Sequence, residues 1–289
     1  MNIKLLFFML MVSLLLGCSD SETETEKAQA KRLSETYNIE IKAGDPTEFW
    51  PEQFPKDGFE LTMEGTTLNN SSEALDGIED ALKIYPKGFV SSIIKSINIC
   101  GSMKMEGSDA GGTFSSNSLI LSSISAWNGT GTNYTNALRG VHHELSSLIY
   151  LRSIFATLAW KKLMPKNWKP SINNHETLSV NNNIEPNYAS GFLTEYGMTN
   201  IENDFNVYAE FIFIEPEYII KLATKYPIIA KKLGLIISAY TNADPEYSNE
   251  FKTYFNKTGL QKVSIPSEKV VLTLKVNTEN IKPKISYDN

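Results

Sequence analysis

The stretch from Gly140 to Tyr150 constrains this chain more than any other, because its spacing predicts a helix with two different faces. At ~100° per residue, one face carries His143, Ser147, Tyr150 and Ile154. The roughly opposite face carries Val141, Leu145, Leu148 and Arg152. We expect the helix to run over about residues 134–163, between Gly131 and Pro165, with one side packed and the other lining a cleft.

This helix carries the first half of the H-E-x-x-H zinc motif, in which two histidines bind one Zn²⁺ and the glutamate polarises the metal-bound water. By position, His143 is a candidate metal ligand and Glu144 a candidate general base. Ser147 stands where the second histidine is expected, and a neutral hydroxyl is a poor zinc ligand beside an imidazole or a carboxylate. A core helix with two hydrogen-bonded histidines is the alternative interpretation of these residues.

The N-terminus predicts export and a lipid anchor. Residues 1–17 form a signal peptide, in which Lys4 precedes an apolar run that is short for a transmembrane helix. The run ends in Leu15-Leu16-Gly17-Cys18, which resembles a bacterial lipobox with Cys18 as the acylated residue. Acylated Cys18 would hold the mature chain on a membrane without spanning it. An ordinary signal peptide with an unmodified cysteine is the alternative.

We expect residues 18–35 to form a polar tether and residues 36–289 to form one folded domain. Residues 19–26 are acidic and lack apolar side chains, so they cannot offset the entropy cost of ordering. They also resemble the acidic segment behind the lipidated cysteine of surface-exported lipoproteins in the Bacteroidetes, which would place the domain on the outer face of the outer membrane. A plain flexible linker is equally compatible with this composition.

Charge and cysteine content exclude several classes of function. The formal net charge of −6 gives no electrostatic reason to expect a nucleic-acid partner. Cys100 is the only cysteine besides Cys18, so the sequence predicts neither a structural disulfide nor a cysteine-based zinc site. We expect Cys100 to be a small buried residue within a strand.

Hydrophobic periodicity predicts an α+β domain. Strands are expected at residues 37–42, 90–99, 113–122 and 269–276, and helices at residues 73–85, 216–239 and 247–257. A capping box at residues 199–202 should begin a further helix, whose buried face carries Ile201, Phe205, Tyr208 and Ile212. The long segment between Pro165 and Gly197 contains His175, and loops of this length are usually either functional or mobile.

Several segments, taken in order, resemble one known family. They are Tyr37–Ile41, Ala110–Thr113 followed by Leu119–Ser122, His142–Glu144, and Gly191–Tyr196 followed by Glu202–Phe205. Together they resemble the zinc-binding metallopeptidase lipoproteins of Bacteroidetes, also called substrate import-associated zinc metallohydrolase lipoproteins. The resemblance implies a zincin-like domain, with a small mixed sheet packed on a central active-site helix and further helices C-terminal to it. It also implies bound zinc and, as partners, a TonB-dependent transporter and its substrate-binding lipoprotein.

The resemblance can be carried over residue by residue. The family has H-H-E-F-x-H in the first helix and E-D-F-A-E in the second, whose first glutamate is the third zinc ligand. His143 and Glu144 match, whereas Ser147, Asn203 and Val207 stand where a histidine, the ligand glutamate and a supporting glutamate are expected. The resemblance therefore implies a degenerate zinc site. Substitute ligands are conceivable among His175, Glu202, Asp204 and Glu210.

These observations favour a cell-surface lipoprotein, associated with outer-membrane nutrient uptake, that binds a peptide or a nutrient-derived ligand without cleaving it. The alternative is an active zinc metallopeptidase with a non-standard ligand set, in which His143 binds the metal and Glu144 is the general base. A purely structural lipoprotein of a transporter assembly is a third possibility, for which an intact cleft would not be needed.

Overall fold

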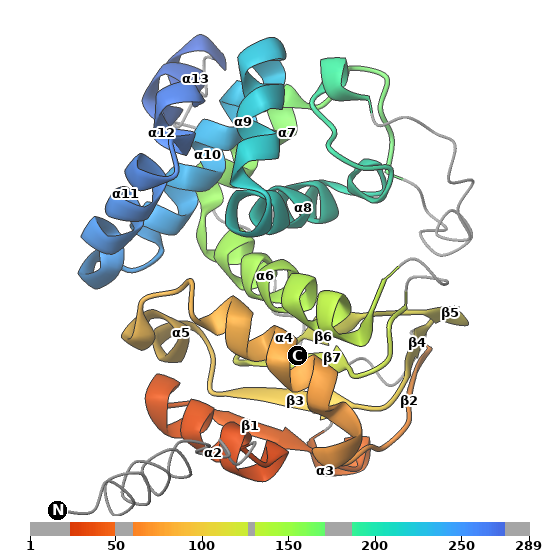
Figure 1. Ribbon diagram of the computed structural model, residues 1–289. Helices are drawn as coiled ribbons and strands as arrows, with labels where there is room; N and C mark the ends of the chain where they lie inside the picture. Colours follow the sequence, from red (N-terminus) through yellow and green to blue (C-terminus); the bar gives the residue numbers. More distant parts are fainter. Residues whose placement is uncertain (1–23, 50–59, 127–130, 171–186, 275–289) are drawn as a thin grey trace, which may run out of the picture.

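The computed structural model describes residues 24–49, 60–126, 131–170 and 187–274, and everything below concerns these residues (Figure 1). They form a mixture of helices and strands, which confirms the expected α+β class. The signal peptide, Cys18 and His175 lie outside the described residues. None of the described helices is both long and apolar enough to cross a membrane.

A four-stranded sheet in the order β1-β3-β7-β6 forms the centre of the N-terminal half. Strands β1 (Glu40–Ala43), β3 (Ser96–Cys100) and β7 (Ser118–Ser122) are parallel, and β6 (Gly112–Phe114) runs antiparallel to β7 at the edge. Since successive side chains of a strand point to opposite faces, this register places apolar residues of neighbouring strands side by side on one face. They include Ile41, Ile97, Ile99, Leu119 and Leu121.

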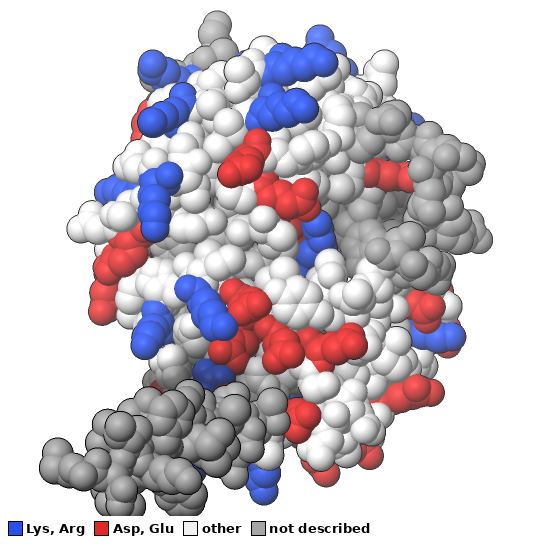
Figure 2. Space-filling view, viewed as in Figure 1, with Lys and Arg blue, Asp and Glu red and all other residues white. Residues whose placement is uncertain are grey.

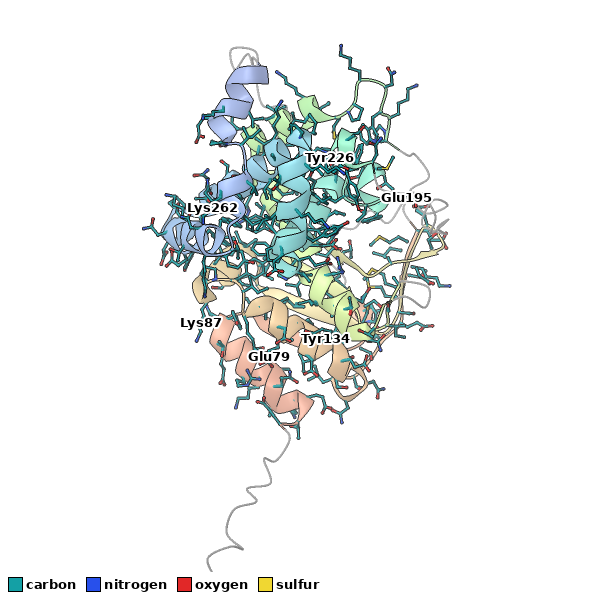
Figure 3. All side chains as sticks on the ribbon, turned by 45° about the horizontal axis from the view of Figure 1, so that its top comes forward. Glu79, Lys87, Tyr134, Glu195, Tyr226 and Lys262 are labelled. Carbon is teal, nitrogen blue, oxygen red and sulfur yellow. The ribbon has the colours of Figure 1, made fainter. Side chains whose placement is uncertain are left out.

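Four helices share one hydrophobic core with this apolar face. They are α2 (Glu26–Tyr37), α4 (Ser72–Leu82), α5 (Lys87–Ile93) and the long helix α6 (Asn133–Arg152). Helices α4 and α6 approach closely at Gly77, where an added Cβ would lie 2.3 Å from the carbonyl oxygen of Tyr134. The Tyr134 hydroxyl donates to Asp80 Oδ2 at 2.8 Å, and Figure 3 shows Tyr134 beside this part of α4.

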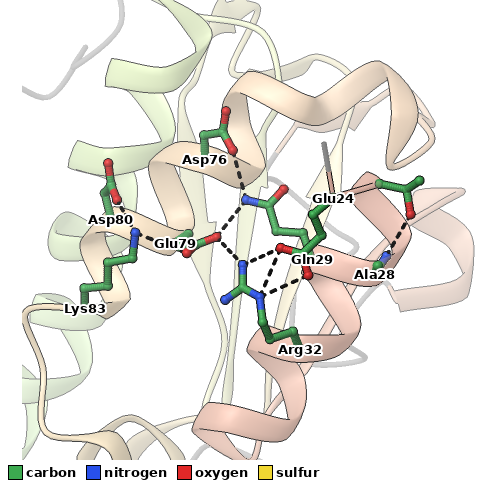
Figure 4. A network of polar contacts seen from close by, with 9 residues as sticks. Glu24, Ala28, Gln29, Arg32, Asp76, Glu79, Asp80 and Lys83 are labelled. Carbon is green, nitrogen blue, oxygen red and sulfur yellow. Dashed lines mark hydrogen bonds and ion pairs between the residues drawn. The ribbon is translucent and has the colours of Figure 1, made fainter. Parts of the chain in front are cut away.

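The folded domain begins earlier than expected, because residues 26–35 of the predicted tether form most of α2 and bury Leu33. A network around Glu79 holds α2 on α4 (Figure 4). Gln29 and Arg32 both donate to Glu79 at 2.8 Å, and Lys83 lies 3.1 Å from it. Partial burial opposes ionisation of Glu79, but these hydrogen bonds outweigh it and lower its pKa to about 2.

A second, three-stranded sheet covers part of the opposite face of the central sheet. It consists of β2 (Leu61–Met63), β4 (Met103–Met105) and β5 (Ser108–Asp109). Cys100, Met103 and Ile120 form a small core between the sheets, against which Phe49 of the short helix α3 (Pro46–Phe49) packs. Cys100 is thus a buried strand residue, as predicted.

The C-terminal half is helical and lies above α6 in Figure 1. Its helices are α7 (Ile154–Leu163), α8 (Ile201–Ile214), α9 (Pro216–Lys225), α10 (Pro227–Ala243), α11 (Ser248–Lys257), α12 (Leu260–Val263) and α13 (Ser267–Leu274). Short 3-10 turns are η2 (Asn69–Ser71), η3 (Tyr188–Ser190), η4 (Tyr196–Met198) and η5 (Pro245–Tyr247). On the face drawn in Figure 2, acidic and basic side chains of the described residues are interspersed without a continuous basic surface.

Two predicted elements differ from the observed ones, and both differences lie next to a proline. The strand expected at residues 90–99 begins only at Ser96, because α5 starts directly after Pro86 and buries Phe89, Val90 and Ile93 at helical spacing. The helix expected at residues 216–239 is two helices, because Pro227 disfavours a helical conformation of Tyr226 before it.

Three further boundaries were predicted wrongly. The long helix expected at residues 134–163 breaks at Ser153, which has a non-helical ψ of 58°. The N-cap of α8 is Asn200 rather than Thr199, since the Asn200 side chain accepts from the backbone N–H of Asn203 at 2.7 Å. The described part of the strand expected at residues 269–276 belongs to α13, which ends at Leu274, because a short apolar run does not distinguish strand from helix.

Candidate functional site

The candidate site lies where α6 packs on α8, beside the edge strand β6. The His143 ring nitrogen Nδ1 lies 2.8 Å from Glu210 Oε1. The other oxygen of Glu210 accepts from Arg139 at 3.1 Å, and Arg139 also forms an ion pair with Glu215. Four side chains of alternating charge therefore connect the two helices, and Arg139 and His143 are one turn apart on α6.

Glu210 fixes the hydrogen-bonding pattern of His143. An ionised carboxylate is only an acceptor, so Nδ1 is the donor in this pair and Nε2 is left to face a ligand. Burial acts to lower the pKa of His143, but the hydrogen bond to Glu210 and the charge of Glu144 outweigh it, and the pKa lies above its ordinary value. The ring also lies against Tyr196 of η4, at 5.5 Å between the centroids.

Glu144 lies directly under β6. A Cβ on Gly112 would lie 3.1 Å from Glu144 Oε1, so a larger residue at this position would press on the carboxyl group. Glu144 is 8% exposed, and burial raises its pKa to about 7, with the negative charges of Glu202 and Glu210 acting in the same direction and His143 against them. The carboxyl group is therefore partly protonated at neutral pH.

His142 has a different role from its neighbour. Its ring is fully buried, its Nδ1 lies 2.7 Å from the Tyr85 hydroxyl, and it stacks on Phe213 at 5.1 Å. Burial lowers the pKa of His142 to about 3, so the ring is neutral. His142 is therefore a core histidine. The alternative interpretation of this helix expected this role for both His142 and His143.

The structure pairs Ser147 with Asn206 and not with Asn203, the residue at the expected ligand position. The Asn206 side chain donates to the Ser147 hydroxyl at 2.7 Å, and both residues are buried. Asn203 lies in the first turn of α8 and donates to Thr199 Oγ1 at 2.8 Å. Because Asn206 and Glu210 are one turn apart, they form a row that faces Ser147 and His143 on α6.

The other proposed ligands are not gathered around His143. Asp204 points into the helical core, where it meets Lys232 at 2.5 Å and the Trp160 indole N–H at 2.7 Å. Glu202 is half-buried in the first turn of α8, and its charge acts on His143 only at longer range. Of the three candidates in the described residues, only Glu210 contacts His143. It does so at Nδ1, the position of a partner that orients the ring for a ligand at Nε2.

The residues present do not fit a zinc site. In the part of the chain that the structure describes, no group of three or more His, Cys, Asp or Glu side chains is arranged to hold a metal ion. His143 would supply one imidazole, whereas the positions opposite it hold a hydroxyl and an amide. Structural and catalytic zinc sites have at least three protein ligands.

Sequence reasoning missed Arg139, Asn206 and Glu215. A signal for Arg139 was present, because a basic residue four positions before His143 shares its helix face. No local signal identifies Asn206 as the partner of Ser147, since the contact depends on how α6 and α8 slide along each other. Comparison with protein-family models, with characterised proteins and with solved structures gave no match, so the function has to be inferred from the site itself.

Proposed function

We propose that this chain is a surface-anchored lipoprotein whose zincin-like domain binds a peptide or a nutrient-derived ligand without hydrolysing it, beside an outer-membrane uptake system. The observation that carries the proposal is the hydrogen bond between Ser147 and Asn206. The Asn206 amide N–H donates to the Ser147 hydroxyl, and we take these two residues to stand in place of metal ligands. Loss of even one supporting partner weakens metal binding ~10–100-fold, so loss of two ligands should abolish it.

The contacts of α8 suggest a second register for the family pattern, beside the one in which Asn203 stands at the ligand position. The pattern E-D-F-A-E fits residues 206–210, Asn-Val-Tyr-Ala-Glu, with identity at Ala209 and Glu210. In this register Asn206 replaces the ligand glutamate, and Glu210 is the supporting carboxylate that orients His143. In this register the carboxylate that supports the histidine matches the family pattern, and the metal ligands differ from it.

The edge strand β6 gives the site a surface for an extended ligand. It is the last strand of the described central sheet, and it passes over Glu144 at Gly112. An extended peptide can add to such an edge through main-chain hydrogen bonds. A peptide bound there would lie over Glu144 and His143, where a partly protonated carboxyl group and a free Nε2 can bond to its amide groups.

Zinc content tests the proposal. Protein purified without chelator should contain far less than one equivalent of zinc by elemental analysis and show no chelator-sensitive peptide hydrolysis. The double variant Ser147→His with Asn206→Glu restores two imidazoles and a carboxylate and should bind about one equivalent of zinc at ligand distances of ~2.0–2.2 Å. The matched control, Ser147→His with Asn203→Glu, should not bind zinc tightly, because Asn203 faces Thr199.

One outcome would favour the alternative function. Stoichiometric zinc in the wild-type protein, lost in His143→Ala, would overturn the proposal. It would support an active metallopeptidase with Glu144 as the general base and with ligands drawn from outside the pairs described above. Equal zinc binding by the two double variants would instead refute the second register of α8.

A further inference from the structure

A second polar site lies on the face of the central sheet opposite α2, α4, α5 and α6. It is a pocket of about 250 Å³, lined by Lys42, Phe49, Ser96, Asn98, Ser115 and Ser118, among others. Strands β1, β3 and β7 bring Lys42 next to Asn98 and Ser96 next to Ser118. Further along the same face, Cys100 and Ile120 are covered by the small sheet. The pocket therefore begins where that cover ends.

Asn98 has a buried acceptor without a partner at this pocket. The residue is 2% exposed, its Nδ2 donates to Ser96 Oγ at a long 3.3 Å, and its Oδ1 has no hydrogen-bond partner among the described residues. Buried amide oxygens are nearly always paired, so this one needs an explanation. The terminal torsion of asparagine is broad, so the weakly held amide of Asn98, which lines the pocket, is able to rotate.

The other lining groups indicate the chemistry of a ligand. Lys42 lies 3.1 Å from the carboxylate of Glu40, so one charge of each sign stands beside the pocket and neither sign is favoured in a ligand. The hydroxyls of Ser115 and Ser118 lie 2.7 Å apart, and each keeps further capacity to donate or accept. Phe49 adds an apolar wall. The ligand should therefore be neutral, carry donors for Asn98 Oδ1, and have an apolar side.

We infer that this pocket binds a neutral polyhydroxylated ligand of about one sugar ring, with Asn98 as a binding residue. A hydroxyl group can donate to Asn98 Oδ1, whereas a fully ionised anion cannot. The volume is below the ~300 Å³ at which pockets for drug-sized ligands begin, which suits a single ring. The inference is independent of the α6–α8 site, because the pocket lies on the opposite face of the sheet from α6.

Ligand-observed NMR on the full chain tests the inference with glucose, galactose, N-acetylglucosamine and, as an anion, inorganic phosphate. At least one sugar should bind saturably, and Asn98→Leu should weaken it tenfold or more. The melting temperature of Asn98→Leu should not fall, because the variant removes an unpaired acceptor. Ser118→Ala is a second variant expected to weaken binding, and His143→Ala should leave it unchanged.

Three results would overturn the inference. The first is binding of phosphate in preference to all sugars, which would make the pocket an anion site. The second is the absence of binding by every probe. The third is an unchanged sugar affinity in both Asn98→Leu and Ser118→Ala. A lower melting temperature of Asn98→Leu would count equally against the inference, because it would mean that Asn98 has a structural partner. Loss of sugar binding in His143→Ala would assign the sugar to the α6–α8 site instead.

Discussion

The buried pair of Asp204 and Lys232 allows a stability prediction with a defined magnitude. Both side chains are fully buried, and each has one further hydrogen-bond partner, while the Lys232 ammonium group also lies over three aromatic rings. Asp204 accepts from the Trp160 indole at 2.7 Å, and Lys232 donates to the carbonyl oxygen of Gly191 at 2.9 Å. Burial raises the pKa of Asp204 to about 6 and lowers that of Lys232, so desolvation works against both charges.

Removal of one partner leaves the other charge buried and unpaired. Lys232→Met should therefore lower the free energy of unfolding by about 3–5 kcal/mol. The Gly191 carbonyl remains bonded to the Tyr208 hydroxyl in that variant, so no further penalty arises. Asp204→Leu should cost about 1–3 kcal/mol more, because it also leaves the Trp160 N–H without an acceptor. The double variant, Asp204→Leu with Lys232→Met, should lose mainly the ~1–3 kcal/mol that comes from the unpaired Trp160 N–H.

Urea unfolding of the four proteins at pH 8 and pH 5 gives the double-mutant cycle. Without Lys232, the folded-state pKa of Asp204 should rise above about 6, whereas an aspartate in the unfolded chain has its ordinary pKa of 3.8. A carboxyl group with a raised folded-state pKa loses stability as pH rises through this window, so Lys232→Met should be less destabilised at pH 5 than at pH 8. A cost below about 1 kcal/mol at pH 8, or equal costs at both pH values, would refute the buried, isolated pair.

Three other perturbations have clear expected outcomes. Phe205→Ala should cost about 3–5 kcal/mol in urea unfolding, because its ring is fully buried against Tyr150 and Trp160, whereas the exposed Phe155→Ala should change stability by under ~0.5 kcal/mol. Cys18→Ala should move the protein from the membrane fraction to the soluble fraction, and continued sedimentation with membranes would contradict the lipid anchor. Glu79 has a lowered pKa in the folded state, so its stabilisation is fully present above the ordinary glutamate pKa of 4.5. The free energy of unfolding should therefore fall between pH 4.5 and about 2. Glu79→Gln should make this fall smaller.

Local patterns predicted the parts of the fold that depend on one element alone. Phe205, Tyr208 and Ile212 are buried as the helical spacing indicated, and Cys100 is a buried strand residue. The prolines gave ambiguous signals, because Pro86 and Pro227 each begin a helix where a helix end or a continuous helix was expected. A proline fixes its own φ angle but does not say on which side of it a helix lies.

The candidate site needed information that no single element contains. The motif made His143 a candidate functional residue, but the partner of His143 could not be predicted from the sequence. Asn203, Asn206 and Glu210 lie within about two turns of one helix, and which of them meets α6 depends on the axial position of α8. That position is set by packing of Phe205 and Tyr208 on Trp160 and by the pull of Asp204 towards Lys232. The side chains that determine the site are therefore on the opposite side of α8 from it.

The contacts of Glu210, Arg139 and Glu144 are compatible with the proposed binding role. Glu210 and Arg139 join α8 to α6 through His143, so these charges stabilise the helix pair whether or not metal is bound. Glu144 has no such partner, and its raised pKa means that keeping an ionisable group there costs stability as pH rises through about 7. A partly protonated carboxyl group under an edge strand can donate a hydrogen bond to a ligand carbonyl, which an ionised one cannot. Such a donor would give Glu144 a role in peptide binding that requires no metal.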